Sequence, residues 1–255
     1  MNRVAVLGAG AVGARVARQL LSSDAVEQVL LRDISAERLA RASRSLGDRC
    51  RVEHHPFSDS LEADVVVVAT PRGTHLEAVI ETIAGRRPAV LVGDGLAETI
   101  AVLRRSGDAA RAGVPIAVGS GFGPGMSCVL AAHGASWFDE VDEVHVAKVG
   151  TGGPACALVH HRALSRRSYD WRVDDGSGAG DWTRRTGGSG RELAWFPDPV
   201  GPRDCYRAAL PDPVLLHHAL PTVGRITARV AATRRDRLTA PLPMLSPPHV
   251  EGGMG

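Results

Sequence analysis

The sequence feature that most constrains this chain is a glycine pattern, Gly8-x-Gly10-x-x-Gly13, directly after the apolar run Val4 to Leu7. Gly8 lets a strand turn sharply, Gly10 leaves room for a pyrophosphate beside the backbone, and Gly13 lets the following helix pack closely. The anion then lies against the free N–H groups at the helix N-terminus. The pattern predicts a dinucleotide-binding turn. Its predicted cofactor contacts are Gly8, Gly10, Ala11, Val12 and Gly13.

The residues around this turn support the same interpretation. Apolar residues at helical spacing follow the turn and predict one buried helix face: Val12, Val16, Leu20 and Leu21. The next apolar run, Val26 to Leu31, leads into Asp33, twenty-five residues beyond Gly8. An acidic residue at about this distance meets the adenosine ribose in dinucleotide-binding folds.

Asp33 predicts the cofactor preference. Its carboxylate accepts hydrogen bonds from ribose hydroxyls and repels a 2′-phosphate, so NAD is favoured over NADP. Two alternatives remain open. Asp33 can instead be a turn or capping residue before Ser35, and Arg32 and Arg38 are close enough in sequence to hold a 2′-phosphate.

Composition narrows the class of partner and the compartment. The chain has 255 residues, 44% of them hydrophobic, and a formal net charge of +2, which suits one large or two modest domains. No basic run is interleaved with aromatic residues, so we expect a small-molecule substrate and no nucleic acid. The start of the chain contains neither a signal peptide nor a membrane span, which predicts a cytoplasmic protein without membrane association.

The cysteines predict neither disulfides nor a metal. The four of them form no C-x-x-C pattern and no recognised Cys/His metal spacing, so we expect reduced, mostly buried thiols. They are Cys50, Cys128, Cys156 and Cys205.

The first half of the chain alternates between predicted strands and helices. After the first two strands, the run 63–69 predicts a parallel strand covered on both faces, and 88–92 and 114–118 predict two more, with helices over 74–84 and 96–105. A capping-box pattern, Thr74-His75-Leu76-Glu77, opens the first of these helices. Ligands lie beyond the carboxyl ends of such strands. Four further cofactor contacts are therefore predicted: Ala69, Thr70, Pro71 and His75.

The alternation stops at the glycine-rich stretch 119–125, which predicts a crossover between two domains. We expect an α/β fold, with a Rossmann doubly wound parallel sheet over residues 1–125 and an α+β substrate and dimerisation domain over 126–255. In the second domain, 126–133 and 154–164 predict helices, and 141–149, 171–173, 193–196 and 205–208 predict strands of a mostly antiparallel sheet. The polar segment 174–190 predicts a mobile loop, with a substrate lid as the alternative. The extended Pro-rich end, 241–248, predicts either a disordered tail or a chain that is shorter than its relatives.

Several motifs together resemble the saccharopine dehydrogenase-like oxidoreductases. Besides the N-terminal glycine pattern they are Gly121-Phe122-Gly123-Pro124-Gly125, Gly150-Thr151-Gly152-Gly153-Pro154-Ala155 and Trp195-Phe196-Pro197-Asp198-Pro199-Val200-Gly201. The resemblance implies NAD(P)-dependent hydride transfer at a C–N or C–O centre of a small amino-acid-like or carbonyl substrate. It also implies an enzyme that forms a homodimer. Relatives usually continue into further strands and a helix, so the ending at Gly255 predicts a shortened substrate domain.

A second family is also similar. The stretch from Ala69 to Ala84 looks like the corresponding segment of the Gfo/Idh-type sugar dehydrogenases, which follow the next strand with a Glu-Lys-Pro motif. Here that position reads Gly93-Asp94-Gly95, so the catalytic lysine of that family is absent. The Gfo/Idh resemblance therefore ranks second, as a sugar or aldehyde dehydrogenase.

Hydride transfer also requires a group that exchanges a proton with the substrate. Asp94 follows a predicted strand end between two glycines, and Lys148, the chain's single lysine, ends a predicted strand. These two are the predicted catalytic residues. Asp94 can instead cap the next helix, and Lys148 can be a solvated strand residue. Three further histidines, His133, His160 and His161, could each shuttle a proton near neutral pH, but we expect them at the surface or in the core.

A non-enzymatic alternative also stays open. A Rossmann protein can bind NAD(H) as a sensor or scaffold without turnover. An amino-acid substrate needs an arginine clamp for its carboxylate, and the second domain offers six candidates without a basis for choosing. They are Arg162, Arg166, Arg167, Arg184, Arg185 and Arg203.

Overall fold

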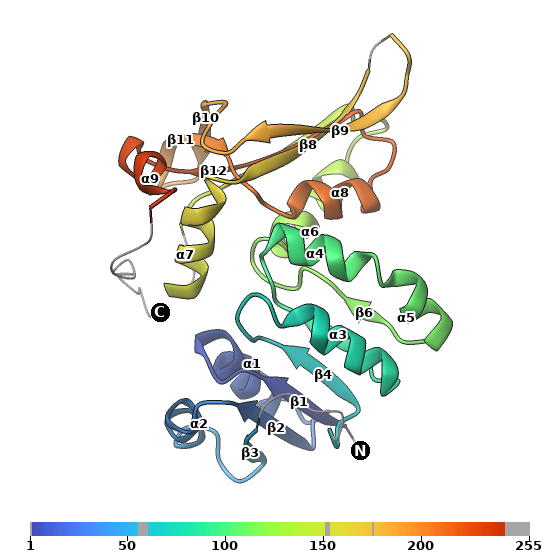
Figure 1. The fold of residues 1–255 in the computed structure, drawn as a ribbon, viewed down its shortest axis with the longest axis vertical. Helices are drawn as coiled ribbons and strands as arrows, with labels where there is room; N and C mark the ends of the chain where they lie inside the picture. The colour runs from blue at the N-terminus through green and yellow to red at the C-terminus, as the bar shows by residue number, and fades with distance from the viewer. Residues whose placement is uncertain (1, 56–60, 151–153, 175, 243–255) are drawn as a thin grey trace. The chain divides into compact units, whose positions relative to one another are not determined.

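The structure is a computed structural model, and it describes residues 2–55, 61–150, 154–174 and 176–242. These residues pack as two compact units (Figure 1). Unit 1 comprises residues Met1–Gly93 and Ala97–Gly121, and unit 2 comprises Asp94–Leu96 and Phe122–Gly255. The predicted motif residues 151–153, and the Pro-rich tail from residue 243 onward, lie outside the described residues.

Unit 1 is built on a sheet of six parallel strands in the order β3-β2-β1-β4-β5-β6. The strands are β1 (Arg3–Leu7), β2 (Gln28–Asp33), β3 (Cys50–His54), β4 (Val65–Val68), β5 (Ala89–Leu91) and β6 (Ile116–Ala117). This strand order is that of a dinucleotide-binding Rossmann fold, in which the order reverses between β1 and β4. The predicted fold class is confirmed for this unit.

Helices cover the two faces of this sheet because its central strands are apolar on both sides. They are α1 (Ala11–Leu21), α2 (Ala36–Ser43), α3 (His75–Ala84), α4 (Leu96–Leu103) and α5 (Ser106–Ala112). Val4, Val6, Val29 and Leu31 pack on the face toward α1 and α2, and Ala5, Leu7, Val66 and Val68 pack on the other face. Two apolar cores, one on each face of the sheet, therefore support the strand ends where the predicted ligand contacts lie.

The predicted apolar face of α1 is confirmed for three of its four residues. Leu21 is buried and the partly buried Val16 and Leu20 pack against the same core, whereas Val12 is 46% exposed at the start of the helix. The predicted capping box on α3 is wrong, because the Thr74 side chain makes no capping hydrogen bond and its hydroxyl instead contacts the Thr70 hydroxyl and the Pro71 carbonyl.

Unit 2 contains an antiparallel sheet in the order β10-β11-β12-β8-β9, with β7 added parallel to β12. The strands are β7 (Glu143–Lys148), β8 (Arg167–Val173), β9 (Gly180–Thr186), β10 (Glu192–Phe196), β11 (Gly201–Arg207) and β12 (Arg225–Ala231). The described helices of this unit are α6 (Met126–Ala135), α7 (Pro154–Ala163), α8 (Asp212–Ala219) and α9 (Arg234–Thr239). The predicted α+β architecture is confirmed.

The prediction of a mobile loop over 174–190 is wrong for its central part. Residues Gly180–Thr186 form β9, which pairs along its whole length with β8. Trp182 lies opposite Trp171, and their rings meet edge to face with centroids 5.3 Å apart. The polar residues of β9 hide this pattern because a strand at a sheet edge needs only one buried face.

Candidate functional site

The carboxyl ends of β1 and β4 bring most of the predicted cofactor residues together. Gly8 has φ +101°, and a Cβ there would lie 2.6 Å from the carbonyl oxygen of Ala69. A Cβ on Gly13 would lie 1.8 Å from the carbonyl oxygen of Gly8. Both glycines are therefore required by the packing of this turn, and they place it beside the loop that begins at Ala69, Thr70 and Pro71.

Gly10 differs from the other two glycines. A Cβ at this position would meet nothing within 4 Å, so its small size is not required by packing inside the protein. Gly10 is the N-cap of α1 and makes no side-chain cap, and the first turn of α1 carries no acidic residue. The first N–H groups of a helix have no partner within it and attract an anion. Open space beside unpartnered amides fits the pyrophosphate of a dinucleotide.

Asp33 lies at the end of β2 and is buried. Its carboxylate accepts hydrogen bonds from the backbone N–H groups of Ala9 (2.7 Å) and Ser35 (2.8 Å), and it pairs with the Arg38 guanidinium at 2.8 Å. Burial alone would raise the pKa of Asp33, but Arg38 and the two amides outweigh it and lower the pKa. The carboxylate is therefore held ionised at the place expected for the adenosine ribose.

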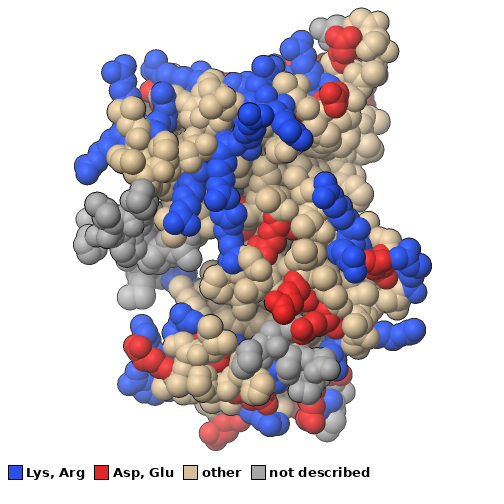
Figure 2. Space-filling model, viewed as in Figure 1, with Lys and Arg blue, Asp and Glu red and all other residues tan. Residues whose placement is uncertain are grey.

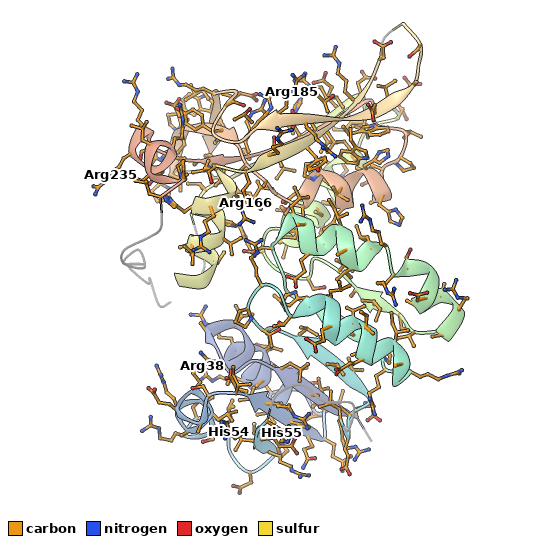
Figure 3. The ribbon with its side chains drawn as sticks, in the orientation of Figure 1. Arg38, His54, His55, Arg166, Arg185 and Arg235 are labelled. Atoms are coloured by element: carbon orange, nitrogen blue, oxygen red, sulfur yellow. The ribbon has the colours of Figure 1, made fainter. Side chains whose placement is uncertain are left out.

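The two arginines proposed for a 2′-phosphate behave differently. Arg32 is buried and pairs with Glu53, on the sheet face opposite to Asp33, because successive residues of a strand alternate between faces. Arg38 is the exposed partner of Asp33. Figure 3 labels Arg38 beside the start of α2. Of these two arginines, only Arg38 lies where it can meet the ribose.

His75 is buried and holds the loop after β4. Its Nε2 lies 2.9 Å from the Thr70 carbonyl, and its backbone N–H donates to Glu98 of α4 at 2.9 Å. A Cβ on Gly93 would lie 2.4 Å from the imidazole Nδ1, so Gly93 makes room for the ring. His75 therefore shapes the Thr70–Pro71 loop, and its contact with a cofactor stays a prediction.

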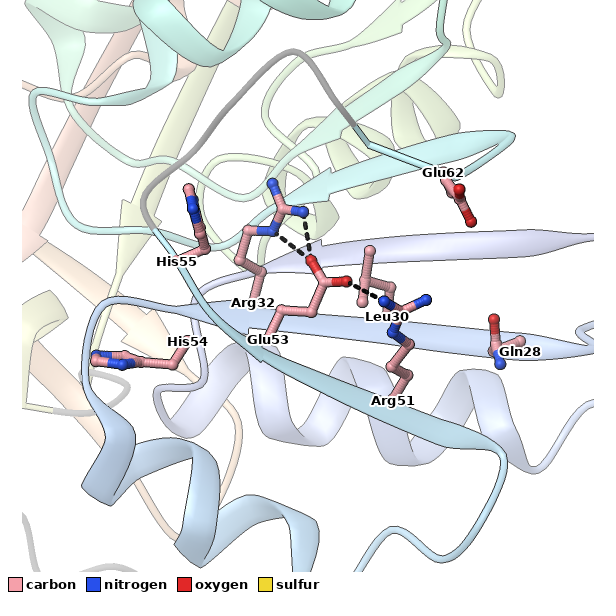
Figure 4. Close-up of a pocket in the computed structure, with 8 residues that line it drawn as sticks. All are labelled: Gln28, Leu30, Arg32, Arg51, Glu53, His54, His55 and Glu62. Carbon is pink, nitrogen blue, oxygen red and sulfur yellow. Dashed lines mark hydrogen bonds and ion pairs between the residues drawn. The ribbon is translucent and has the colours of Figure 1, made fainter.

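A cavity of about 560 Å³ opens elsewhere in unit 1, along β2 and β3 (Figure 4). Figure 4 shows the Glu53 carboxylate between Arg32 and Arg51, and it forms an ion pair with each of them. None of the predicted cofactor contacts lines this cavity. It follows the sheet face rather than the strand ends, where Rossmann folds bind dinucleotides.

Lys148 ends β7 and is buried in unit 2. Its ammonium lies 3.1 Å from the Asp212 carboxylate, with the two side chains 4% and 0% exposed. Asp212 begins α8 and also accepts a 2.6 Å hydrogen bond from the Ser127 hydroxyl. A Cβ on Gly123 would lie 2.8 Å from the lysine Nζ. The glycine-rich stretch predicted as a crossover thus leaves room for this lysine.

His160 of α7 lies near Asp94, the second predicted catalytic residue. Its Nε2 lies 3.9 Å from the Asp94 carboxylate and 3.8 Å from the Cys156 sulfur. Burial lowers the pKa of His160 and the charge of Lys148 lowers it further, while Asp94 and Asp212 act in the opposite direction. Burial and the charge of Lys148 therefore outweigh the two carboxylates and favour the neutral form of the His160 imidazole.

Two residues in these contacts, His160 and Asp212, were not predicted as site residues from the sequence. His160 was grouped with surface or core histidines, and Asp212 was not singled out. The spacing Cys156-x-x-x-His160 places both side chains on one helix face and was the available signal. Asp212 gave no signal, because its partners Ser127 and Lys148 are distant in sequence.

Four of the arginines considered for a carboxylate clamp lie on the sheet of unit 2, namely Arg167, Arg184, Arg185 and Arg203, whereas Arg162 lies in α7 and Arg166 between α7 and β8. Figure 2 shows Lys and Arg side chains gathered over the sheet, and Figure 3 labels Arg166 and Arg185. Arg184 of β9 lies over the ring of Tyr169, 5.6 Å from its centroid. These positions do not single out one arginine as a clamp.

Comparison with known families assigns unit 1. Residues 2–119 match the model of the Gfo/Idh/MocA group, described as an oxidoreductase family with an NAD-binding Rossmann fold. This is the family that ranked second from the sequence. The N-terminal unit is therefore an NAD-binding Rossmann domain of oxidoreductase type. None of the curated proteins compared with the chain matches it.

Solved structures resemble the chain at low identity. Apo saccharopine dehydrogenase (L-Glu forming) from Saccharomyces cerevisiae gives a TM-score of 0.65 at 14% identity, over 93% of this chain and 56% of that one. A myo-inositol dehydrogenase from Corynebacterium glutamicum gives 0.48 at 13% identity, over 91% and 68%. GenD2 from gentamicin A biosynthesis, in complex with NAD, gives 0.48 at 18% identity, over 90% and 65%. The first similarity shows the fold, and the chain spans about half of that relative.

Within the described ranges, each helix is too short or too polar to cross a bilayer. None of the four cysteines, all of which are described, is in a disulfide.

Proposed function

We propose that this protein is an NAD-dependent oxidoreductase of Gfo/Idh type that transfers hydride at a C–O centre of a small carbonyl or polyol substrate. The observation that carries the proposal is the open space at Gly10 beside the N-terminus of α1, in a domain that matches an NAD-binding oxidoreductase family. Gly10, Ala11 and Val12 would hold the pyrophosphate, and Asp33 the adenosine ribose. Bound NAD⁺ supplies the hydride acceptor.

Lys148 and Asp94 are the proposed proton-transfer residues. In the oxidative direction the Lys148 amine accepts the proton of the substrate hydroxyl as the hydride leaves carbon, and in the reductive direction its ammonium returns that proton. Asp212 positions Lys148 through their 3.1 Å contact. Asp94 follows the end of β5 by three residues, where the Gfo/Idh pattern has lysine. Lys148, the chain's single lysine, would supply the ammonium that this position lacks.

The fold similarity over 93% of the chain favours a second candidate, a saccharopine dehydrogenase-type reaction at a C–N centre. The same proton-transfer residues would then serve an amine or imine nitrogen.

Nicotinamide absorbance with a substrate panel tests both candidates. Polyols and aldehydes represent the first class, and amino acids or keto acids with amines represent the second. Lys148→Met should lose turnover while NAD binding is unchanged, and the control Glu143→Gln, on the same strand with a half-exposed side chain, should keep both. NAD binding without turnover on any panel member would overturn both enzymatic candidates in favour of an NAD(H) sensor.

A further inference from the structure

Three different metal-binding side chains converge in unit 2. They are Asp94, from the short segment Asp94–Leu96, and Cys156 and His160, from α7. One donor atom from each lies within 4.8 Å of the other two. The residues are 62 positions apart in sequence from Asp94 to Cys156, so the fold, and not local chain geometry, assembles the group.

The three groups are gathered without strong bonds to one another. The imidazole Nε2 lies 3.9 Å from the Asp94 carboxylate, beyond hydrogen-bonding distance, and 3.8 Å from the Cys156 sulfur, at the long limit for sulfur. Both neighbours approach the same ring nitrogen. A proton on that nitrogen cannot make a good hydrogen bond to each of them, whereas a metal ion can accept all three donors.

The distances are close to those of a tetrahedral site. With about 2.3 Å to sulfur and about 2.0 Å to nitrogen or oxygen, a tetrahedral zinc holds sulfur and nitrogen about 3.5 Å apart, and nitrogen and oxygen about 3.3 Å apart. The observed 3.8 Å between sulfur and nitrogen and 3.9 Å between nitrogen and oxygen are longer than this by about 0.3 and about 0.6 Å, and the sulfur and the carboxylate oxygen lie within 4.8 Å of each other. Metal binding therefore requires closure of the three side chains. Side-chain rotation of the partly exposed Asp94 and Cys156 can supply it.

The charges around the group also suit a divalent cation. A thiolate and a carboxylate balance two positive charges, and the neighbouring Lys148 is already balanced by Asp212. The mixed sulfur, nitrogen and oxygen donors exclude Mg²⁺ and Ca²⁺, which prefer oxygen alone.

We propose that Asp94, Cys156 and His160 form a binding site for a divalent transition-metal cation of the zinc class. Three protein ligands leave a fourth position open, which a water or a substrate oxygen can take. The site does not rest on the proposed reaction. If the cation is bound, Asp94 is a ligand, and Lys148 remains as the proton-transfer residue.

The test is a titration of the tag-free, chelator-treated full chain with Co²⁺ in the presence of reductant and without nucleotide. We expect one saturable equivalent with a thiolate-to-cobalt charge-transfer absorbance, displaced by Zn²⁺. Cys156→Ala should lose this absorbance, and His160→Gln should lose saturable binding. The matched controls, Cys50→Ala in unit 1 and His161→Gln on the same helix, should keep both signals.

Tryptophan fluorescence reports whether each variant is folded, since all four tryptophans lie in unit 2 at positions 137, 171, 182 and 195. Absence of saturable binding to the folded wild type would overturn the site. Retention of the charge-transfer absorbance in folded Cys156→Ala would do the same. NAD titration of the same samples is a separate measurement, so failure of the metal site and failure of the proposed function are distinguishable.

Discussion

Removing one partner of the buried pair of Lys148 and Asp212 should destabilise unit 2 strongly. At 3.1 Å and an effective dielectric constant of about 20, their attraction is about 5 kcal/mol. Asp212→Asn removes the charge but keeps the size and the acceptor for the Ser127 hydroxyl. It leaves a buried ammonium without its counter-charge, which costs about 3 to 5 kcal/mol of unfolding free energy.

Urea unfolding followed by tryptophan fluorescence measures this loss, because every tryptophan reports on unit 2. The double variant Lys148→Met, Asp212→Asn removes both charges, so its loss should be smaller than the sum of the two single losses by a coupling energy of about 2 to 3 kcal/mol. Glu143→Gln is the control, since it weakens a pair whose side chains are 46% and 37% exposed and should change stability by less than about 1 kcal/mol.

Two results would refute this reasoning. One is a loss for Asp212→Asn no larger than that for Glu143→Gln. The other is a double variant whose loss equals the sum of the two single losses, because the buried charges would then be energetically independent.

Three further predictions concern the cofactor turn and the thiols. Gly10→Ala should keep the unfolding free energy within about 0.5 kcal/mol and weaken NAD binding, whereas Gly13→Ala should destabilise unit 1 by about 1 to 3 kcal/mol, as circular dichroism and calorimetry can check. The lowered pKa of Asp33 adds stability above its unfolded value of about 3.9, and this contribution is lost as pH falls through the native value. Acid unfolding should therefore cost wild type more stability than Asp33→Asn, and equal losses would contradict the assignment. Burial raises the pKa of Cys205, so mass spectrometry should find it alkylated only after unfolding.

The Rossmann half of the fold was predictable because its signals are local. Apolar runs such as Val65–Val68 mark strands buried on both faces, and Gly8 and Gly13 mark a turn that tolerates no side chain. By contrast, β9 and its arginines read as a loop, since a strand with one solvent face needs few apolar residues.

The site of unit 2 was only half predictable for a different reason. Asp94 and Lys148 stand out because each lies at a strand end, where ligands gather. Their grouping with His160 and Asp212 depends on contacts between residues 64 and 66 positions apart, and no local pattern carries that information.

Calorimetric titration of the wild-type chain with NAD⁺ and NADH tests the central claim most directly, that the amides after Gly10 hold a dinucleotide pyrophosphate. The account predicts saturable binding of one nucleotide per chain, with NADP⁺ binding more weakly because of the ionised Asp33. Absence of heat and of thermal stabilisation with all four pyridine nucleotides would contradict it.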